Sequence, residues 1–86
     1  MKVSVYDTYV RRSDGRVMHF DILVPDTETN LEKIYGFGRE FLKSKGQNAA
    51  ILSARECRYC HIEQATPEIV RSIEQNGCYI IEMENC

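Results

Sequence analysis

The segment KVSVYDTYVR (residues 2–11), followed by SDG (13–15) and RVMHFDILV (16–24), decides the fold. Both longer runs are rich in β-branched and aromatic residues, which favour strands, and the tripeptide between them consists of turn-forming residues. The pattern therefore predicts a β-hairpin. If the last two residues of the tripeptide form a two-residue turn, Asp7 lies opposite Ile22.

In this register one face of the hairpin collects the apolar side chains and forms the core side. Its members are Val3, Val5, Asp7, Tyr9, Met18, Phe20, Ile22 and Val24. Asp7 is the exception on this face, because a buried carboxylate without partners is costly. We expect either a bulge that turns Asp7 outward or hydrogen bonds that satisfy it, and a functional acid is the alternative.

An apolar stripe at helical spacing predicts a helix near residues 30–45. Thr29 and Glu32 have the spacing of a capping box at its start. Gly36 and Gly38 lie inside this helix, where each costs about 1 kcal/mol relative to alanine. Close packing of the helix on the sheet is the explanation that we prefer for both glycines.

The tripeptide Thr66-Pro67-Glu68 predicts a second helix over residues 67–76, because threonine is a good N-cap and proline fits the first helical position. Residues 49–55 form a short apolar run that is compatible with a third strand. Residues 56–65 are interpreted as a loop, and residues 78–83 as the last strand.

The element order is therefore ββαβαβ, which predicts an α/β (α+β) protein with a four-stranded mixed sheet. Right-handed crossovers place both helices on one face of the sheet, in two layers. With 86 residues the chain is one domain, 1–86. The expected core residues are Phe20, Ile22, Val24, Ile34, Leu42, Ile51, Ile73 and Ile80.

Composition and charge narrow the classes of function. The net charge of −2 disfavours a nucleic-acid partner, which usually requires a basic excess. The sequence contains no apolar segment of the length needed for export or for a membrane span, so we expect a cytoplasmic protein with reduced cysteines. A core of this size leaves a thin margin of stability, to which a homodimer contact or a bound metal would add.

The segment Cys57-Arg58-Tyr59-Cys60-His61 carries the strongest signal of chemistry. Its C-x-x-C spacing lets both sulfurs reach one zinc ion at about 2.3 Å, with His61 as a third ligand. A fourth ligand has to come from elsewhere in the chain. Cys86 is the first candidate, because a chain end can fold back at small entropic cost, and His19 and Cys78 are the others.

Three other interpretations of this segment remain. A redox pair would use the same cysteines, but it lacks the helix N-terminus that usually lowers the pKa of the first thiol. Haem attachment matches the letters of the motif, yet it belongs to exported chains. A thiol-rich structural loop, with His61 in a local hydrogen bond, is the simplest interpretation.

A second polar cluster is predicted on the hairpin and consists of Asp7, Thr8, His19 and Asp21. His19 and Asp21 are two residues apart on one strand, so their side chains face the same way, and Thr8 is a cross-strand neighbour. Such a pair can orient an imidazole for base catalysis. The sequence places no nucleophile beside it, so we favour a structural pair.

The motifs YDTYV (6–10), MHFD (18–21) and CRYCH (57–61), in this order and in a chain of this length, resemble the small bacterial family catalogued as domain of unknown function 2024. The resemblance spans essentially the whole chain and implies no activity, substrate or cofactor. It implies that a recurrent polar pattern comprises Asp7, Thr8, His19, Asp21, Cys57, Cys60 and His61.

Two hypotheses of function follow. The favoured one is a binding or interaction module for an unknown protein or small ligand, with zinc as the candidate cofactor. The alternative is a thiol-dependent redox protein or small enzyme that uses the Cys57 to His61 segment. A metal site protects its thiols until the metal is removed, whereas a catalytic thiolate reacts quickly from the start.

Overall fold

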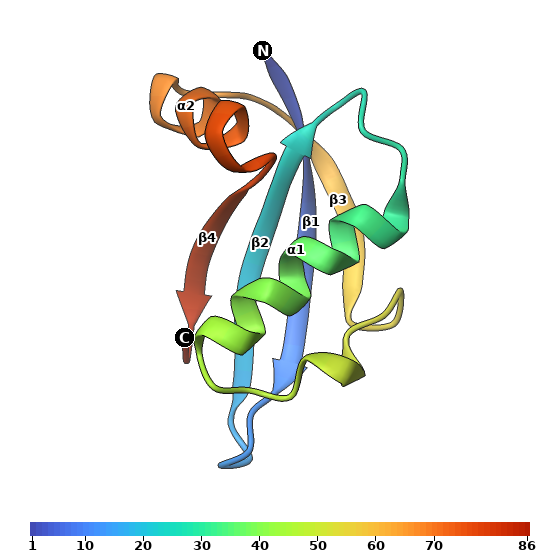
Figure 1. The fold of residues 1–86 in the computed structure, drawn as a ribbon, viewed down its shortest axis with the longest axis vertical. Helices are drawn as coiled ribbons and strands as arrows, with labels where there is room; N and C mark the ends of the chain where they lie inside the picture. The colour runs from blue at the N-terminus through green and yellow to red at the C-terminus, as the bar shows by residue number, and fades with distance from the viewer.

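The computed structural model describes residues 1–86, apart from the side chain of Ile51, which was expected in the core and lies outside this description. The α+β class and the order ββαβαβ are confirmed (Figure 1). The elements are β1 (Lys2–Arg11), β2 (Val17–Pro25), α1 (Leu31–Ser44), the short 3-10 helix η1 (Ala49–Ile51), β3 (Cys57–Gln64), α2 (Pro67–Asn76) and β4 (Tyr79–Glu84).

The sheet has the strand order β3-β1-β2-β4, and every neighbouring pair is antiparallel. The expectation of a mixed sheet was therefore wrong. The strands β2 and β3 do run parallel, as a crossover through α1 requires, but β1 lies between them. The parallel strands β2 and β3 are therefore not hydrogen-bonded to each other.

The two helices lie on opposite faces of the sheet, and the prediction of one shared face was wrong. The α1-side cluster contains Phe20, Ile22 and Ile34, whereas the α2-side cluster contains Leu23 and Ile73. The handedness rule governs connections between parallel strands. Because β3 and β4 run antiparallel, the rule leaves the face of α2 undetermined, and Figure 1 places α2 at the end of the sheet where β4 begins.

The hairpin between β1 and β2 has a three-residue loop instead of the expected two-residue turn. The amide of Arg12 donates to the carbonyl of Arg16 over 2.7 Å, and Gly15 has a φ of 89°. A left-handed residue at the end of a three-residue loop is characteristic of a bulged hairpin and suits glycine. The loop shifts the register by one residue, so Asp7 lies opposite Asp21 instead of Ile22.

This shift exchanges the faces of β1 relative to those of β2, because side chains alternate along a strand. The face beneath α1 combines Tyr6, Thr8 and Val10 with Phe20 and Ile22. The expected core residues Phe20, Ile22, Val24, Ile34, Leu42 and Ile73 are buried, and Ile80 is partly buried. The opposite face carries Asp7 and Tyr9 beside His19 and Asp21.

The helix boundaries follow local end signals. The helix α2 covers the predicted residues 67–76, with Thr66 as N-cap and Gly77 in the left-handed conformation at its end. In α1 the N-cap is Asn30, whose side chain accepts a hydrogen bond from the amide of Lys33, so the expected Thr29 capping box does not form. No helix in the described part of the chain is long and apolar enough to cross a membrane.

The third strand lies later in the chain than expected. Residues 49–51 form η1, and the motif that was interpreted as a loop is β3. The side chain of Asn48 caps η1 by accepting a hydrogen bond from Ala50, which turns the apolar run into a 3-10 helix. The cysteine motif is therefore held in the sheet, at its edge.

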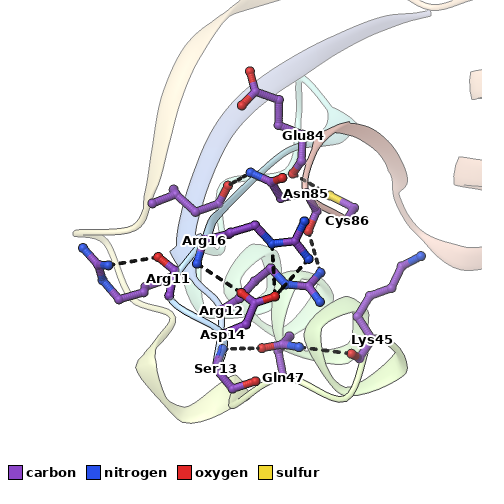
Figure 2. Close-up of polar contacts among 12 residues, drawn as sticks. Arg11, Arg12, Ser13, Asp14, Arg16, Lys45, Gln47, Glu84, Asn85 and Cys86 are labelled. Carbon is purple, nitrogen blue, oxygen red and sulfur yellow. Dashed lines mark hydrogen bonds and ion pairs between the residues drawn. The ribbon is translucent and has the colours of Figure 1, made fainter.

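The C-terminus is fixed against the hairpin loop (Figure 2). Arg12 donates to the carbonyl of Asn85 over 2.7 Å, and the side-chain amide of Asn85 donates to the carbonyl of Val17 over 2.8 Å. The thiol of Cys86 is 3.5 Å from the carbonyl oxygen of His19. These contacts hold the last residues beside β2, at the opposite side of the sheet from β3.

Candidate functional site

The candidate site lies on the sheet face opposite α1, beyond the part that α2 covers. The helix α2 packs on Val3, Val5 and Leu23 through the α2-side cluster. Further along the strands, Asp7 pairs with Asp21 and Tyr9 pairs with His19 across β1 and β2. We call this surface the open face.

Three potential metal ligands converge on the open face. The Nε2 atom of His19 is 3.4 Å from Oδ1 of Asp21 and 3.8 Å from Oδ1 of Asp7. One ligand atom from each of the three residues lies within 4.8 Å of the others. Among the residues described, this is the one group of three or more metal-binding side chains with such spacing.

His19 is held in place from one side by an aromatic ring. The rings of Tyr9 and His19 are stacked, with centroids 4.2 Å apart and an angle of 12° between their planes. The side chains of His19 and Asp21 are 19% and 13% exposed, so water has little access to them. Two of their buried atoms, His19 Nε2 and Asp21 Oδ1, have no hydrogen-bond partner among the described residues.

The two carboxylates of this group titrate differently. Burial, together with the hydrogen bond to Asp7 and the negative charge of that residue, raises the pKa of Asp21 to about 6. The hydrogen bond from Asp21 lowers the pKa of Asp7. In the ion-free protein Asp21 therefore keeps its proton to a higher pH than Asp7 does.

A bulge in β3 brings a thiol and a second imidazole to the same face. The pairing of β1 with β3 shifts between Val5 and Tyr6, which are opposite His61 and Tyr59, so Cys60 is the extra residue. The thiol of Cys60 lies near the carboxyl group of Asp7, which raises the pKa of the thiol. A bulge redirects side chains that regular alternation would send to the other face.

Cys60 also begins a chain of polar contacts along β3. Its sulfur is 3.0 Å from Nδ1 of His61, and Nε2 of His61 is 2.6 Å from Oε1 of Glu63. Desolvation, followed by the hydrogen bond to Asp7 and the charges of Asp7, Asp21 and Glu63, raises the pKa of Cys60. The thiol form is thus favoured as long as no cation is bound.

The structure does not bring the four expected metal ligands together. Cys57 is 3% exposed and belongs to the α1-side cluster, whereas Cys60 is exposed on the open face. The sheet separates the two sulfurs, because residues on a strand alternate between faces and Cys60 lies in the bulge. Burial raises the pKa of Cys57, which suits a structural thiol.

The distant candidates are also placed apart from Cys60. Cys86 follows β4, and three strand spacings of about 4.8 Å separate β4 from β3. Cys78 and Cys86 both pack against the α1-side cluster. Of the ligands proposed from the motif, Cys60 and His61 are neighbours, and His19 is the distant candidate that lies on their face.

The predicted polar cluster is brought together except for Thr8. Asp7, His19 and Asp21 meet on the open face, whereas Thr8 is fully buried on the other face, opposite Cys57 in the sheet. Asp7 is not an isolated buried carboxylate, because its side chain is 36% exposed and its Oδ1 atom lies 3.8 Å from Nε2 of His19. Its position on the open face follows from the corrected register.

Sequence reasoning missed Tyr9 and Glu63 as parts of the site. The register expected for a two-residue turn placed Tyr9 in the core. Glu63 was assigned to a loop, although its spacing of two residues from His61 would have put both side chains on one face of a strand. The signal for Glu63 was thus present in the sequence once β3 is recognised as a strand.

Comparisons with known proteins agree with this fold. The model of the family described as "Domain of unknown function (DUF2024)" matches residues 1–83. The NMR structure of protein NE1680 from Nitrosomonas europaea is similar, with 42% identity, a TM-score of 0.85, and coverage of 100% of this chain and 99% of that one. No curated protein matches the chain.

Proposed function

The chain belongs to the family described as domain of unknown function DUF2024, and from this premise we propose that it is a small binding module whose open face binds a divalent transition-metal ion, with zinc as the first candidate. The ligands are Asp7, His19 and Asp21. Cys60, which lines the same cavity as Asp7, is the fourth candidate ligand.

The observation that carries the proposal is the spacing of the ligand atoms. Zinc binds imidazole nitrogen and carboxylate oxygen at about 2.1 Å, so neighbouring ligands of a tetrahedral ion lie roughly 3.4 Å apart. The distances from His19 Nε2 to Asp21 and Asp7 are 3.4 Å and 3.8 Å. The three groups thus need little rearrangement to hold one ion.

The charges favour the same conclusion. Two acidic side chains directly opposite each other on neighbouring strands repel when both are ionised. A cation between them removes this repulsion and gives a partner to His19 Nε2 and Asp21 Oδ1, which lack one among the described residues. The group is therefore better suited to a cation than to a purely structural role.

Cys60 extends the site toward softer metals. A bound metal ion lowers the pKa of a coordinating thiol, so the carboxylates that now oppose ionisation of Cys60 would be neutralised by the ion. A thiolate and an imidazole favour zinc over magnesium or calcium, which prefer oxygen ligands. This ligand set is the reason for choosing zinc.

The test is titration of the metal-free protein with Zn²⁺ by isothermal calorimetry. We expect saturable binding of one ion per chain, weakened at least about tenfold in His19→Gln and Asp21→Asn. The matched control is Asp26→Asn, which keeps near wild-type affinity because it changes the same residue type outside the ligand group.

A second titration, with Co²⁺, reports directly on whether a thiolate binds the metal ion. A cobalt–thiolate absorption band in the wild-type protein that disappears in Cys60→Ser would support Cys60 as a ligand, and persistence of the band in that variant would exclude it. Equal zinc affinity in Asp21→Asn and Asp26→Asn would contradict the proposal.

A thiol-dependent enzyme is the second candidate, and the contacts of His61 favour it. The order thiol, imidazole, carboxylate in Cys60, His61 and Glu63 matches the arrangement that activates a cysteine nucleophile. The raised pKa of Cys60 opposes this role. The rate at which iodoacetamide alkylates Cys60 distinguishes the two candidates. If Cys60 is a metal ligand, Zn²⁺ slows its alkylation and a chelator restores it. If His61 activates Cys60 as a nucleophile, alkylation is slower in His61→Gln, with or without Zn²⁺.

A further inference from the structure

We infer that the cavity beside this site binds a small anion in which a carboxylate or phosphate group is attached to a planar aromatic or conjugated system, and that Arg55 and Arg58 hold the anionic group. The cavity has a volume of about 550 Å³, and its lining includes Asp7, Tyr9 and Cys60 together with the two arginines. This volume lies within the range of known small-molecule sites. The inference goes beyond the proposed metal site, because it does not require a metal ion.

The guanidinium groups of Arg55 and Arg58 are available to bind an anionic ligand. In the described part of the chain no carboxylate oxygen lies within 4.0 Å of the guanidinium group of Arg55 or Arg58, whereas Arg12, Arg16 and Arg39 each have an acidic partner. Arg11 and Arg71 also have no acidic partner in the described part of the chain, but only Arg55 and Arg58 line the cavity. They attract an anion.

The nearest acidic residue of the cavity does not neutralise these arginines. Oε1 of Glu56 accepts hydrogen bonds from the amide and the hydroxyl group of Ser53, at 3.0 Å and 2.8 Å. Oδ1 of Asp7 lies 3.8 Å from Nε2 of His19. Both carboxylates therefore have other partners, although Asp7 will reduce the affinity for an anion.

Arg58 is oriented by its surroundings. It lies opposite Asp7 in the sheet, which puts its side chain on the open face. Its Nε atom is 3.4 Å from the carbonyl oxygen of Arg55, so the outer edge of the guanidinium group remains available. This edge is a planar fork of N–H donors that matches a carboxylate or phosphate.

Tyr9 supplies a flat wall. Its ring is stacked on His19 and is half exposed, and it lines the cavity. Because the stacking fixes the ring, a planar ligand can pack against it at small entropic cost. The combination of a ring and two guanidinium groups selects planar anions over aliphatic ones.

The test uses the metal-free protein and follows backbone amide shifts by NMR during titration with benzoate and with phenyl phosphate. We expect saturable shifts in residues 55–60 and in Tyr9, with the better of the two ligands identifying the preferred oxyanion. Benzamide, which has the same ring without the charge, should bind at least about tenfold more weakly. Cyclohexanecarboxylate, which has the charge without the ring, should also bind more weakly.

Matched arginine variants complete the test. Arg55→Gln and Arg58→Gln should each weaken benzoate or phenyl phosphate binding about tenfold, whereas Arg71→Gln on α2 should leave it unchanged. Zinc affinity should stay the same in all three variants, which separates this inference from the metal site. Equal binding of benzamide and benzoate, equal losses in Arg58→Gln and Arg71→Gln, or shifts that do not saturate would each overturn it.

Discussion

At the scale of single residues, the open face is organised by a pair of opposed carboxylates. Asp7 and Asp21 occupy directly opposite positions on β1 and β2, where two full negative charges would repel. In the ion-free protein a proton on Asp21 removes this repulsion below its pKa of about 6, and a bound cation would remove it by charge. The charges of these two residues therefore affect both the pH dependence of stability and the affinity for a cation.

The first prediction is that Asp21→Asn alters the pH dependence of stability. The pKa of Asp21 is about 6 in the folded chain, against about 3.9 in an unfolded chain. The stability contributed by protonated Asp21 is therefore complete below about pH 4 and is lost as the pH rises through 6. An asparagine cannot ionise, and its amide can still donate to Asp7, so the variant avoids this loss.

We expect Asp21→Asn to match the wild-type protein near about pH 4 and to exceed its free energy of unfolding by on the order of 1 kcal/mol above about pH 7. The gain is smaller than the full value of the pKa shift because water screens the pair. Urea unfolding with chelator present measures it, and Asp26→Asn is the control. A gain that is equal at both pH values would show that ionisation of Asp21 plays no part.

The second prediction concerns the two cysteines of the motif. Cys57 is buried under α1 and Cys60 is exposed, so iodoacetamide should modify Cys60 in the native, metal-free protein and modify Cys57 only on unfolding. Mass spectrometry of peptides after timed alkylation measures both rates. Cys57→Ser should leave zinc affinity unchanged. Equal alkylation rates of both thiols would contradict this placement.

At the scale of elements, α1 packs tightly against Leu52 and the sheet at Gly38. A Cβ atom added at Gly38 would lie 2.8 Å from Leu52 Cδ1 and 3.0 Å from Ile22 Cδ1. A Cβ atom added at Gly36 would have no neighbouring heavy atom within 4 Å. Close packing of helix on sheet therefore explains Gly38, and it does not explain Gly36.

The third prediction compares these two glycines. Gly36→Ala should raise the free energy of unfolding by about 0.5–1 kcal/mol, because alanine is the better helix former. Gly38→Ala gains the same propensity but forces Leu52 and Ile22 apart, and we expect a net loss of about 1–3 kcal/mol. Urea unfolding of both variants measures the difference. A stabilised Gly38→Ala variant would show that the side chains of Leu52 and Ile22 yield easily.

At the scale of the whole molecule, one sheet separates two apolar clusters of unequal size. The α1-side cluster runs under the full length of α1, whereas the α2-side cluster covers one end of the opposite face. The open face exists because α2 is short and packs only on that end. The stability of the fold and the access to the site therefore depend on different helices.

The fourth prediction tests the α2-side cluster. Ile73→Ala should reduce the free energy of unfolding by about 2–4 kcal/mol, because Ile73 is 7% exposed between α2 and the sheet. Ile62→Ala on β3 is the control and should cost less than about 0.5 kcal/mol, because Ile62 is 44% exposed. Zinc affinity of the folded Ile73→Ala protein should stay unchanged. Equal losses in the two isoleucine variants would contradict the packing of α2 on this face.

The sequence by itself determined the features that depend on neighbouring residues. The hairpin, the range of α2, its Thr66 cap and its Gly77 end were all predictable, because caps and turns involve atoms within a few residues of each other. The element order and the α+β class follow from these local signals. Of the site, the polar residues Asp7, His19 and Asp21 could be identified as a group.

Only the tertiary structure decided how these residues are arranged. The hairpin register depends on whether the loop has two or three residues, and a shift by one residue moves every side chain of β1 to the other face relative to β2. That shift placed Asp7 opposite Asp21 and away from the core. Likewise the pairing of β3 with β1 separated Cys57 from Cys60, because long-range pairing and its bulge fix which face each side chain occupies.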